Sequence, residues 1–424
     1  MAPTVRKLLI PLAVAATLGG MASNAVAGGF AIGTQSGSGT GNAFAGGAAA
    51  ADDASVAWSN PAAMTLIPGR QVAGALHILK PSFKFSDNGS TGPVFGAAGA
   101  SDGGDGGDWA FVPNGFMTIA INPKLSFGLA LNVPFGLKTE YDTPWRGQLT
   151  AIKSEIKTVN INPSVAYKIS DTVSIGAGVS VQYIDATLSS ANATGTNITE
   201  ITADDIGYGF NVGLMIQAAP DTRIGVTYRS AIKFDLEGNA TFSAVAAANP
   251  GIKADLKVPD SASLSVFHKM NPNWELMGDV TWTGWSSVQR LNVNCTSTTA
   301  VPGICNTVGS TLSSLVLNWD DTWRFGVGAN YKLNDQTKLR FGAALDKTPT
   351  NDVDRTARLP DQDRTWLAFG VQYKPSKTGI LDVGYAHEFI KDATVNNTVA
   401  GAGTLSGTFK NKADIFSIQY SHSF

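Results

Sequence analysis

The stretch that decides the fold is Ile206-Gly207-Tyr208-Gly209-Phe210-Asn211-Val212-Gly213-Leu214-Met215-Ile216-Gln217. Large apolar side chains occupy every second position from Ile206 to Ile216, and mostly small or polar residues stand between them. Because successive side chains of a strand point to opposite faces, this period of two predicts a β-strand with one apolar face and one small or polar face. The same alternation recurs at 173–183 and 323–332.

Such segments repeat along most of the chain, and the connections between them alternate in length. About fourteen strands are predicted, at 71–85, 111–122, 124–134, 155–169, 172–188, 205–218, 222–236, 257–270, 273–288, 313–332, 337–346, 365–374, 378–391 and 407–424. Tight turns such as Asn271-Pro272-Asn273 alternate with long polar loops, predicted at 86–110, 135–154, 189–204, 237–256, 289–312, 347–364 and 392–406. Short turns on one side, long loops on the other and an even strand number are typical of an outer-membrane barrel, whereas a soluble sandwich need not obey this rule. We therefore expect an all-β protein, a fourteen-stranded antiparallel transmembrane barrel over residues 70–424.

The N-terminus has the features of a secretory signal peptide. Arg6-Lys7 precedes an apolar run over 8–18, and the segment ends in Ala25-Val26-Ala27. The run is shorter than the roughly 20 apolar residues that a spanning helix needs. We expect cleavage after Ala27, which would make Gly28 the first mature residue.

Residues 28–69 differ from the rest of the chain. They are rich in Gly, Ala, Ser and Asp and show no sustained period of two, so they are predicted to form a separate small module. Short helical turns are expected at 41–51 and 62–66, with Pro61 and Pro68 limiting their length.

Composition restricts the classes of function. Only 15% of residues are charged, and 31 basic residues stand against 33 acidic ones, so nothing suggests a nucleic-acid partner. The two cysteines, Cys295 and Cys305, are close neighbours in a turn-rich stretch, and we expect a disulfide. Two free thiols are the alternative; a metal site is less favoured because two thiols without a nearby His fall short of a tetrahedral set. No metal and no cofactor are expected.

The C-terminal strand points to a route of assembly. The side chains that share one of its faces are Phe416, Ile418, Tyr420, His422 and Phe424. Of these, His422 fits an apolar row least well. A last strand that ends in Phe resembles the signal read by the barrel-assembly machinery, which we expect as a partner during biogenesis. Aromatic residues at strand ends, such as Tyr167 and Tyr373, fit the girdles that contact outer-membrane lipid.

Three motifs, together with the overall layout of the chain, resemble the FadL family of outer-membrane transporters for long-chain fatty acids and other hydrophobic compounds, which has a toluene-uptake branch. They are Ala51-Asp52-Asp53-Ala54 followed by Asn60-Pro61-Ala62, Asn318-Trp319-Asp320-Asp321-Thr322-Trp323-Arg324, and Leu359-Pro360-Asp361-Gln362-Asp363-Arg364. The resemblance implies that residues 28–69 fold into the lumen as a plug of short helices, in which Asn60, Pro61 and Ala62 form the N-P-A element. It also implies that Phe30 reaches into an interior apolar pocket; the alternative is that Phe30 merely packs the plug.

The family resemblance further implies a sideways exit through a kinked strand. An apolar molecule gains about 0.8 kcal/mol per CH₂ on leaving water, so a pocket that opens into lipid is a better route for it than a wet pore. In the third predicted strand we suspect Gly128, Asn132 and Pro134 at this opening. Pro134 lacks an amide donor; the simpler interpretation, which we favour, is that it just ends the strand.

Charged residues of the expected lumen face bear on the substrate. Arg229, Arg324 and Arg340 fall on this face, and Asp320 shares the phase of Arg324. The family's fatty-acid members have a Lys where Asp320 stands and an Arg near the position of Asp185. A carboxylate at position 320 would repel a fatty-acid carboxylate, unless Asp320 and Arg324 simply pair with each other.

The expected function is uptake of hydrophobic small molecules, with long-chain fatty acids as substrates, by a monomer. Neutral aromatic hydrocarbons such as toluene are the alternative substrate. A non-transport adhesin or structural barrel is the second alternative, although it would not need a plug. An enzyme is not expected, because the four histidines, His77, His268, His387 and His422, have no Ser and carboxylate arranged near them in the sequence.

Overall fold

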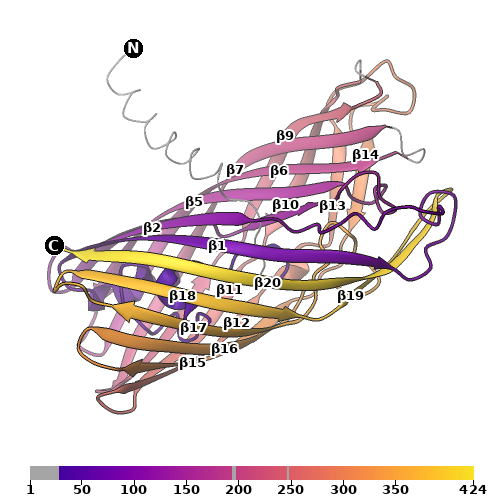
Figure 1. The fold of residues 1–424 in the computed structure, drawn as a ribbon. Helices are drawn as coiled ribbons and strands as arrows, with labels where there is room; N and C mark the ends of the chain where they lie inside the picture. The colour runs from indigo at the N-terminus through magenta and orange to yellow at the C-terminus, as the bar shows by residue number, and fades with distance from the viewer. Residues whose placement is uncertain (1–27, 193–196, 246–247) are drawn as a thin grey trace.

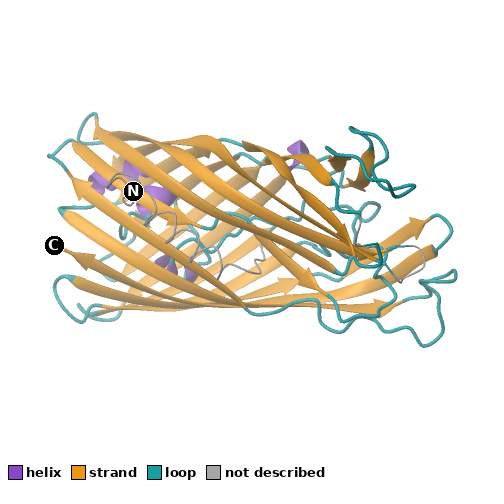
Figure 2. Cartoon of the chain, turned by 90° about the horizontal axis from the view of Figure 1, so that it is seen from above, coloured by secondary structure: helices purple, strands orange, loops and turns teal. Residues whose placement is uncertain are grey.

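The computed structural model describes residues 28–192, 197–245 and 248–424, and the predicted signal peptide at 1–27 lies outside them. The strands form one antiparallel barrel, in which β1 pairs with β20 and so closes the wall (Figure 1). Viewed from above, the short N-terminal helices lie at the end of the barrel that carries the C-terminus, and the longer loops lie at the other end (Figure 2).

The wall contains twenty strand segments in the described chain. They are β1 (Arg70–Asp87), β2 (Ala110–Ala120), β3 (Leu125–Asn132), β4 (Gly136–Glu140), β5 (Lys153–Lys168), β6 (Val173–Ala191), β7 (Ile198–Ala219), β8 (Thr222–Arg229), β9 (Ile232–Phe242), β10 (Gly251–Val258), β11 (Ser261–Lys269), β12 (Trp274–Thr283), β13 (Arg290–Cys295), β14 (Thr311–Val316), β15 (Thr322–Lys332), β16 (Thr337–Asp346), β17 (Arg364–Tyr373), β18 (Gly379–Ile390), β19 (Ala393–Val399) and β20 (Gly403–Ser423). Six barrel strands are interrupted and count as two segments each, namely β3/β4, β8/β9, β10/β11, β12/β13, β14/β15 and β18/β19. The barrel therefore has fourteen strands, which confirms the predicted fold.

The predicted loops are too long, because several strands continue past the apolar alternation. β13 lies within the predicted loop 289–312, β19 lies within 392–406, and β4 lies within 135–154. Beyond the bilayer the outer face of a strand meets water, so it need not be apolar and the pattern that marks a lipid-facing strand is lost. In β9, for example, Lys233 forms an exposed ion pair with Asp235, at 2.7 Å.

The N-terminal segment contains α2 (Gly37–Thr40), α3 (Val56–Ser59) and the 3-10 helix η1 (Pro61–Leu66); a further 3-10 helix, η2 (Trp285–Ser287), interrupts β12/β13. The turn predicted at 62–66 lies within η1, and residues 41–49 form hydrogen-bonded turns rather than a regular helix. The first helix precedes them at 37–40, where the Ser36 side chain accepts a hydrogen bond from the Gly39 amide as N-cap. No helix of the described residues is long and apolar enough to cross a bilayer.

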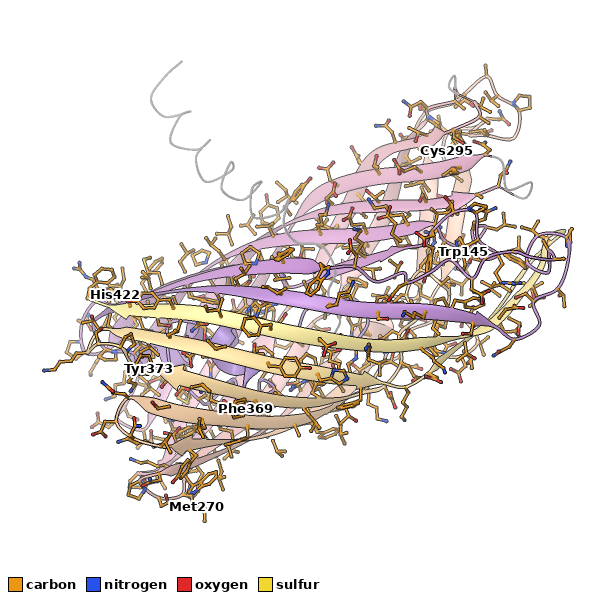
Figure 3. The ribbon with its side chains drawn as sticks, in the orientation of Figure 1. Trp145, Met270, Cys295, Phe369, Tyr373 and His422 are labelled. Carbon is orange, nitrogen blue, oxygen red and sulfur yellow. A yellow bond between two sulfur atoms is a disulfide. The ribbon has the colours of Figure 1, made fainter. Side chains whose placement is uncertain are left out.

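The outer face of the barrel is apolar, as the alternation predicts. Tyr208 is 69% exposed and Phe210 is 50% exposed, whereas Asn211 between Phe210 and Val212 is buried on the inner side. Phe369 and Tyr373 also lie exposed on the wall (Figure 3). A contiguous apolar surface of this kind needs a lipid environment.

Cys295 and Cys305 form a disulfide with a Cα–Cα distance of 5.6 Å. Cys295 is the last residue of β13, and Cys305 lies in the connection to β14. The bond thus lies among the longer loops, at the end of the barrel away from the C-terminus (Figure 3).

Candidate functional site

The N-P-A element attaches the N-terminal segment to the barrel wall. Asn60 is fully buried, and its Nδ2 donates to Ala48 O, within the segment, at 2.8 Å and to Leu214 O, in β7, at 3.1 Å. Its Oδ1 accepts from the Ala62 amide at 3.0 Å and so caps η1, in which Pro61 is the first residue. Asn60 therefore uses both donors and its acceptor at one junction.

Glycines of the wall make room for this junction. A side chain at Gly213 would collide with Asn60 Oδ1, and a side chain at Gly128 would collide with Met64 Sδ of η1. The small residues on the inner face of these strands therefore leave the space that the N-terminal segment needs to pack closely on the wall. Gly128, which the sequence analysis placed at a sideways opening, lies under this segment.

The three lumen arginines all contact the N-terminal segment. Arg340 binds Asp52 at 2.8 Å and Asp382 of β18 at 3.0 Å, so it joins the segment to the wall. Arg324 donates to Ala43 O, and Arg229 stacks on the Trp58 ring, with Cζ 3.4 Å from its centroid. All three cations that the sequence offered for a substrate carboxylate therefore have partners in the protein, and those of Arg229 are neutral: the Trp58 ring, the Trp58 carbonyl and Ser180 Oγ.

The inferred lumen phase of Asp320 does not hold in the structure. Asp320 lies in the break between β14 and β15, where Asn318 has a positive φ of 45°, so the alternation of β15 does not extend to it. Asp320 is exposed, and Arg324 pairs with Asp279 of β12 at 3.4 Å. The pairing of Asp320 with Arg324, considered from the sequence, is therefore wrong.

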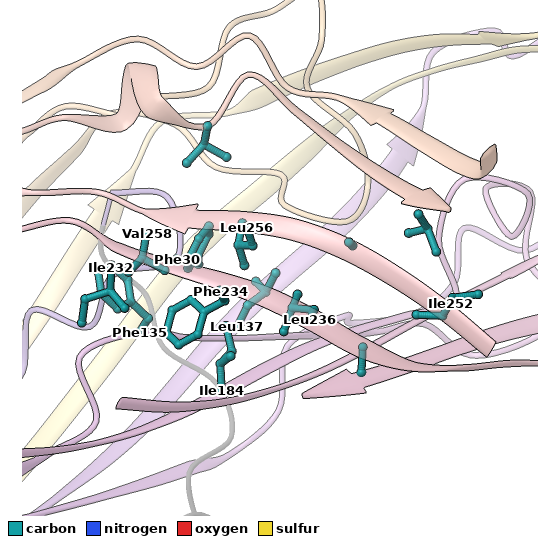
Figure 4. Packing of buried hydrophobic residues seen from close by; sticks show 14 of the residues in the cluster. Phe30, Phe135, Leu137, Ile184, Ile232, Phe234, Leu236, Ile252, Leu256 and Val258 are labelled. Atoms are coloured by element: carbon teal, nitrogen blue, oxygen red, sulfur yellow. The ribbon is translucent and has the colours of Figure 1, made fainter. Parts of the chain in front are cut away.

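Phe30 is the centre of an aromatic cluster. Its ring centroid lies 4.9 Å from that of Trp285 and 5.7 Å from those of Phe135 and Trp319, and Phe30 is only 4% exposed. Phe30 and Phe135 lie together with Leu256 among the buried apolar side chains of the barrel (Figure 4). Trp319 is the part of the second motif that reaches this cluster; Trp285 and Phe135 lie outside the three motifs, and no sequence signal marked them.

The backbone around Phe30 closes a break in the wall. β3 ends at Asn132 and β4 begins at Gly136, so the strand is interrupted at 133–135 rather than ended by Pro134. The Gly136 amide donates to Phe30 O at 2.9 Å, and the Ile32 amide donates to Pro134 O at 2.8 Å. The N-terminal segment thus supplies hydrogen-bond partners that the interrupted strand lacks.

On the side of β2, the broken strand β3/β4 lacks a pairing partner along part of its length. β2 pairs with β3 only from Gly115 to Ala120, and within the described residues no ladder joins its first five residues, 110–114, to β3 or β4. Side chains partly cover this gap: Asn114 Nδ2 donates to Thr34 O at 3.3 Å, and Asn132 Nδ2 donates to Gln35 Oε1 at 2.8 Å. Gln35 in turn donates to Val133 O at 3.0 Å.

The third motif holds the segment that carries Phe30. Asp361 Oδ2 accepts from the Gly29 amide at 2.9 Å and from Thr348 Oγ1 at 2.6 Å. Its Oδ1 pairs with Arg364, which also binds Glu388 at 3.0 Å. All three side chains of this buried ion-pair group are at most 4% exposed, so Asp361 is a rigid support for residue 29.

Three of the cavities of the described chain bear on this site. The outer cavity, about 620 Å³, is lined by loop and strand-end residues that include Leu149, Phe242 and Ile304. The apolar cavity, about 70 Å³, is lined by Phe30, Trp319 and a ring of aliphatic side chains. The plug cavity, about 300 Å³, borders the N-terminal segment and is lined by Phe135, Trp285 and others. The aromatic cluster thus stands between the apolar cavity and the plug cavity.

A family model described as "Outer membrane protein transport protein (OMPP1/FadL/TodX)" matches residues 19–424. The long-chain fatty acid transport protein of Escherichia coli strain K12 is 25% identical over 459 residues, covering 97% of this chain and 98% of that protein. The crystal structure of a Pseudomonas aeruginosa FadL homologue superposes with a TM-score of 0.84 at 27% identity, covering 94% of this chain and 100% of that one. The Ralstonia pickettii toluene transporter TbuX shares the fold, with a TM-score of 0.67 at 20% identity and coverage of 92% and 98%.

Proposed function

This chain belongs to the outer membrane protein transport family that includes FadL and TodX, so it is a non-enzymatic outer-membrane transporter of hydrophobic compounds, and we propose that its substrates are long-chain fatty acids. Membership of a transport family argues against the adhesin and enzyme interpretations. The proposed route runs from the outer cavity to the apolar cavity and leaves sideways at the break in β3/β4.

The single observation that carries the fatty-acid proposal is that the outer and apolar cavities adjoin. Leu188, Leu291 and Leu315 line both of them, so an apolar surface leads from the junction of the two cavities toward Phe30. Each methylene transferred from water to such a surface contributes about 0.8 kcal/mol, so a long alkyl chain gains more along it than a compact ring does.

Because the apolar cavity is small, binding of a long alkyl chain is coupled to opening of the wall at the β3/β4 break. About 70 Å³ holds only a few methylene groups, so a long chain enters fully only if Phe30 moves. Phe30 lies in the same short segment as Ile32, whose amide bonds to Pro134 O across the break. Displacement of Phe30 by the alkyl chain would therefore weaken the contacts that close the wall at 133–135.

Neutral aromatic hydrocarbons are the second candidate substrate. The observation in their favour is that the arginines Arg324 and Arg340 are already paired with carboxylates, and that Asp320 stands in the second motif. A substrate without a carboxylate needs none of these cations.

The test is complementation of a strain that lacks its own fatty-acid channel. The wild-type chain should restore growth on oleate as sole carbon source and should not increase entry of toluene. Phe30→Ala should alter oleate uptake, whereas Phe95→Ala, a matched truncation of a fully buried Phe in the cluster with Phe85 and Trp145, should leave it unchanged. Increased toluene entry without growth on oleate would overturn the proposal and favour the aromatic candidate.

A further inference from the structure

Arg358 lies where the outer cavity meets the apolar cavity. It belongs to the connection 347–363, between β16 and β17, and it lines both cavities together with Leu188, Leu291 and Leu315. The residue is half-buried. It directly precedes the third motif, and the sequence analysis did not single it out.

The hydrogen bonds of Arg358 fix its position without neutralising its charge. Nη1 donates to Lys153 O at 3.2 Å, Ser154 Oγ at 3.1 Å and Ser189 O at 3.3 Å, all on β5 and β6. In the part of the chain that the structure describes, Nε and Nη2 have no hydrogen-bond partner, and no carboxylate forms an ion pair with Arg358. One edge of the guanidinium is thus anchored to the wall, and the other edge is unengaged.

Other arginines near the site differ in this respect. Arg355, which lines the apolar cavity too, is paired with Asp352, and Arg364 is paired with Asp361 and Glu388. Asp354 lines both cavities, but its Oδ2 accepts from the neutral Asn318 Nδ2 at 3.0 Å. A charge held in an apolar surrounding without a counter-ion is costly, and an anionic ligand at the free edge of Arg358 would lower that cost.

The charge of Arg358 persists under physiological conditions. Burial lowers the pKa of its guanidinium to about 10, which still leaves it protonated at neutral pH. A guanidinium presents N–H donors in a planar fork that matches the two oxygens of a carboxylate, and the free Nε–Nη2 edge is one such fork.

We propose that Arg358 binds the carboxylate of the fatty acid at the junction of the two cavities, with the alkyl chain pointing into the apolar cavity toward Phe30. This inference rests on the proposed function. The head group then stays beside the polar residues of the outer cavity, such as Ser190, Thr199 and Asn396, and the chain enters tail first. Arg358 is thereby the residue that selects acids over neutral amphiphiles of the same length.

The test compares oleate with oleyl alcohol, which has the same chain and no charge. Binding of each radiolabelled probe to the purified full-length barrel in amphipol is measured by equilibrium dialysis. Arg358→Gln keeps a donor for the wall but loses the charge, and we expect oleate to bind about tenfold or more weakly, while the alcohol changes by less than about twofold. Arg358→Lys, which keeps the charge, should retain oleate affinity to within about tenfold of wild type.

Arg290→Gln is the matched control, because Arg290 is an exposed arginine that bonds to Ser314 Oγ and does not line either cavity. It should leave both affinities unchanged. If Arg358→Gln weakens oleate and oleyl alcohol equally, or weakens neither, the inference is overturned while the proposed function stands. If the wild-type barrel takes up toluene but neither binds nor takes up oleate, the proposed function itself fails.

Discussion

The Gly29 amide donates to Asp361 Oδ2 at 2.9 Å, which ties the start of the described chain to a residue 332 positions later. Phe30 directly follows Gly29, so this hydrogen bond holds the backbone next to the centre of the aromatic cluster. The bond thus connects the residue before Phe30 to a carboxylate that is itself ion-paired with Arg364.

Asp361→Ala should release Phe30. The change leaves the Gly29 amide without its acceptor and removes one of the two carboxylates of Arg364, and breaking a buried pair in this way costs about 3 to 5 kcal/mol. We expect a lower unfolding temperature and leakage of small apolar dyes into proteoliposomes without fatty acid. Asp363→Ala, two residues along, removes pairs with the exposed Lys347 and Lys391 and a 3.2 Å hydrogen bond from the Thr348 amide, and it should cost less, about 1 to 2 kcal/mol. Equal effects of the two variants would contradict the assigned role of Asp361.

Asn60→Ala, alone or combined with Pro61→Ala, should loosen the N-terminal segment while the barrel still inserts. Three hydrogen bonds of the Asn60 side chain are lost, worth roughly 2 to 4 kcal/mol together. Planar-bilayer recordings should show larger or noisier conductance, and oleate uptake should fall. Ser36→Ala is the control, since Ser36 caps α2 through a single bond to the Gly39 amide. Conductance identical to wild type would show that the junction at Asn60 does not seat the segment.

The disulfide should be accessible from outside the cell. Because Cys295 and Cys305 lie among the longer loops, a membrane-impermeant thiol reagent should label intact cells only after mild reduction. Replacing both by Ser should lower the free energy of unfolding by roughly 2 to 3 kcal/mol, because the disulfide no longer restricts the unfolded chain. Limited proteolysis should then cut between β13 and β14 more rapidly, with barrel assembly unchanged. Labelling without reduction would show that the thiols are free in the cell.

Asp320→Lys should raise uptake of oleate relative to toluene only modestly. Asp320 is exposed and follows Trp319, so an added cation attracts a carboxylate near the apolar cavity but is screened by solvent. Interactions between exposed charges are worth at most about 1 kcal/mol, so the oleate-to-toluene ratio should rise by less than about fivefold. Measured in the same assay, Arg358→Gln should shift the ratio further in the opposite direction. An unmoved ratio in Asp320→Lys would mean that the charge at position 320 plays no part in selection.

The sequence by itself determined the barrel, its strand number and its apolar outer face. A lipid-facing strand must alternate with a period of two, and this requirement is local, so it is visible in runs such as 206–217. The same rule could not reveal where strands continue beyond the bilayer or where they break, because there neither face has to be apolar. Pro134 was therefore interpreted as a strand end, although β4 resumes at Gly136.

Only the tertiary structure decided which charges are free. Asp320 and Arg324 lie four positions apart, yet Arg324 pairs with Asp279, 45 positions away, because a break precedes β15 and antiparallel register places Arg324 beside β12. Likewise Arg340 is paired with Asp52 and Asp382, whereas Arg358, which carried no sequence signal, keeps an unpaired edge at the cavities. Alternation indicates the face on which a side chain lies. The partner that the side chain meets across the lumen depends instead on strand register and on the path of the N-terminal segment. Both are set by contacts between residues far apart in the chain.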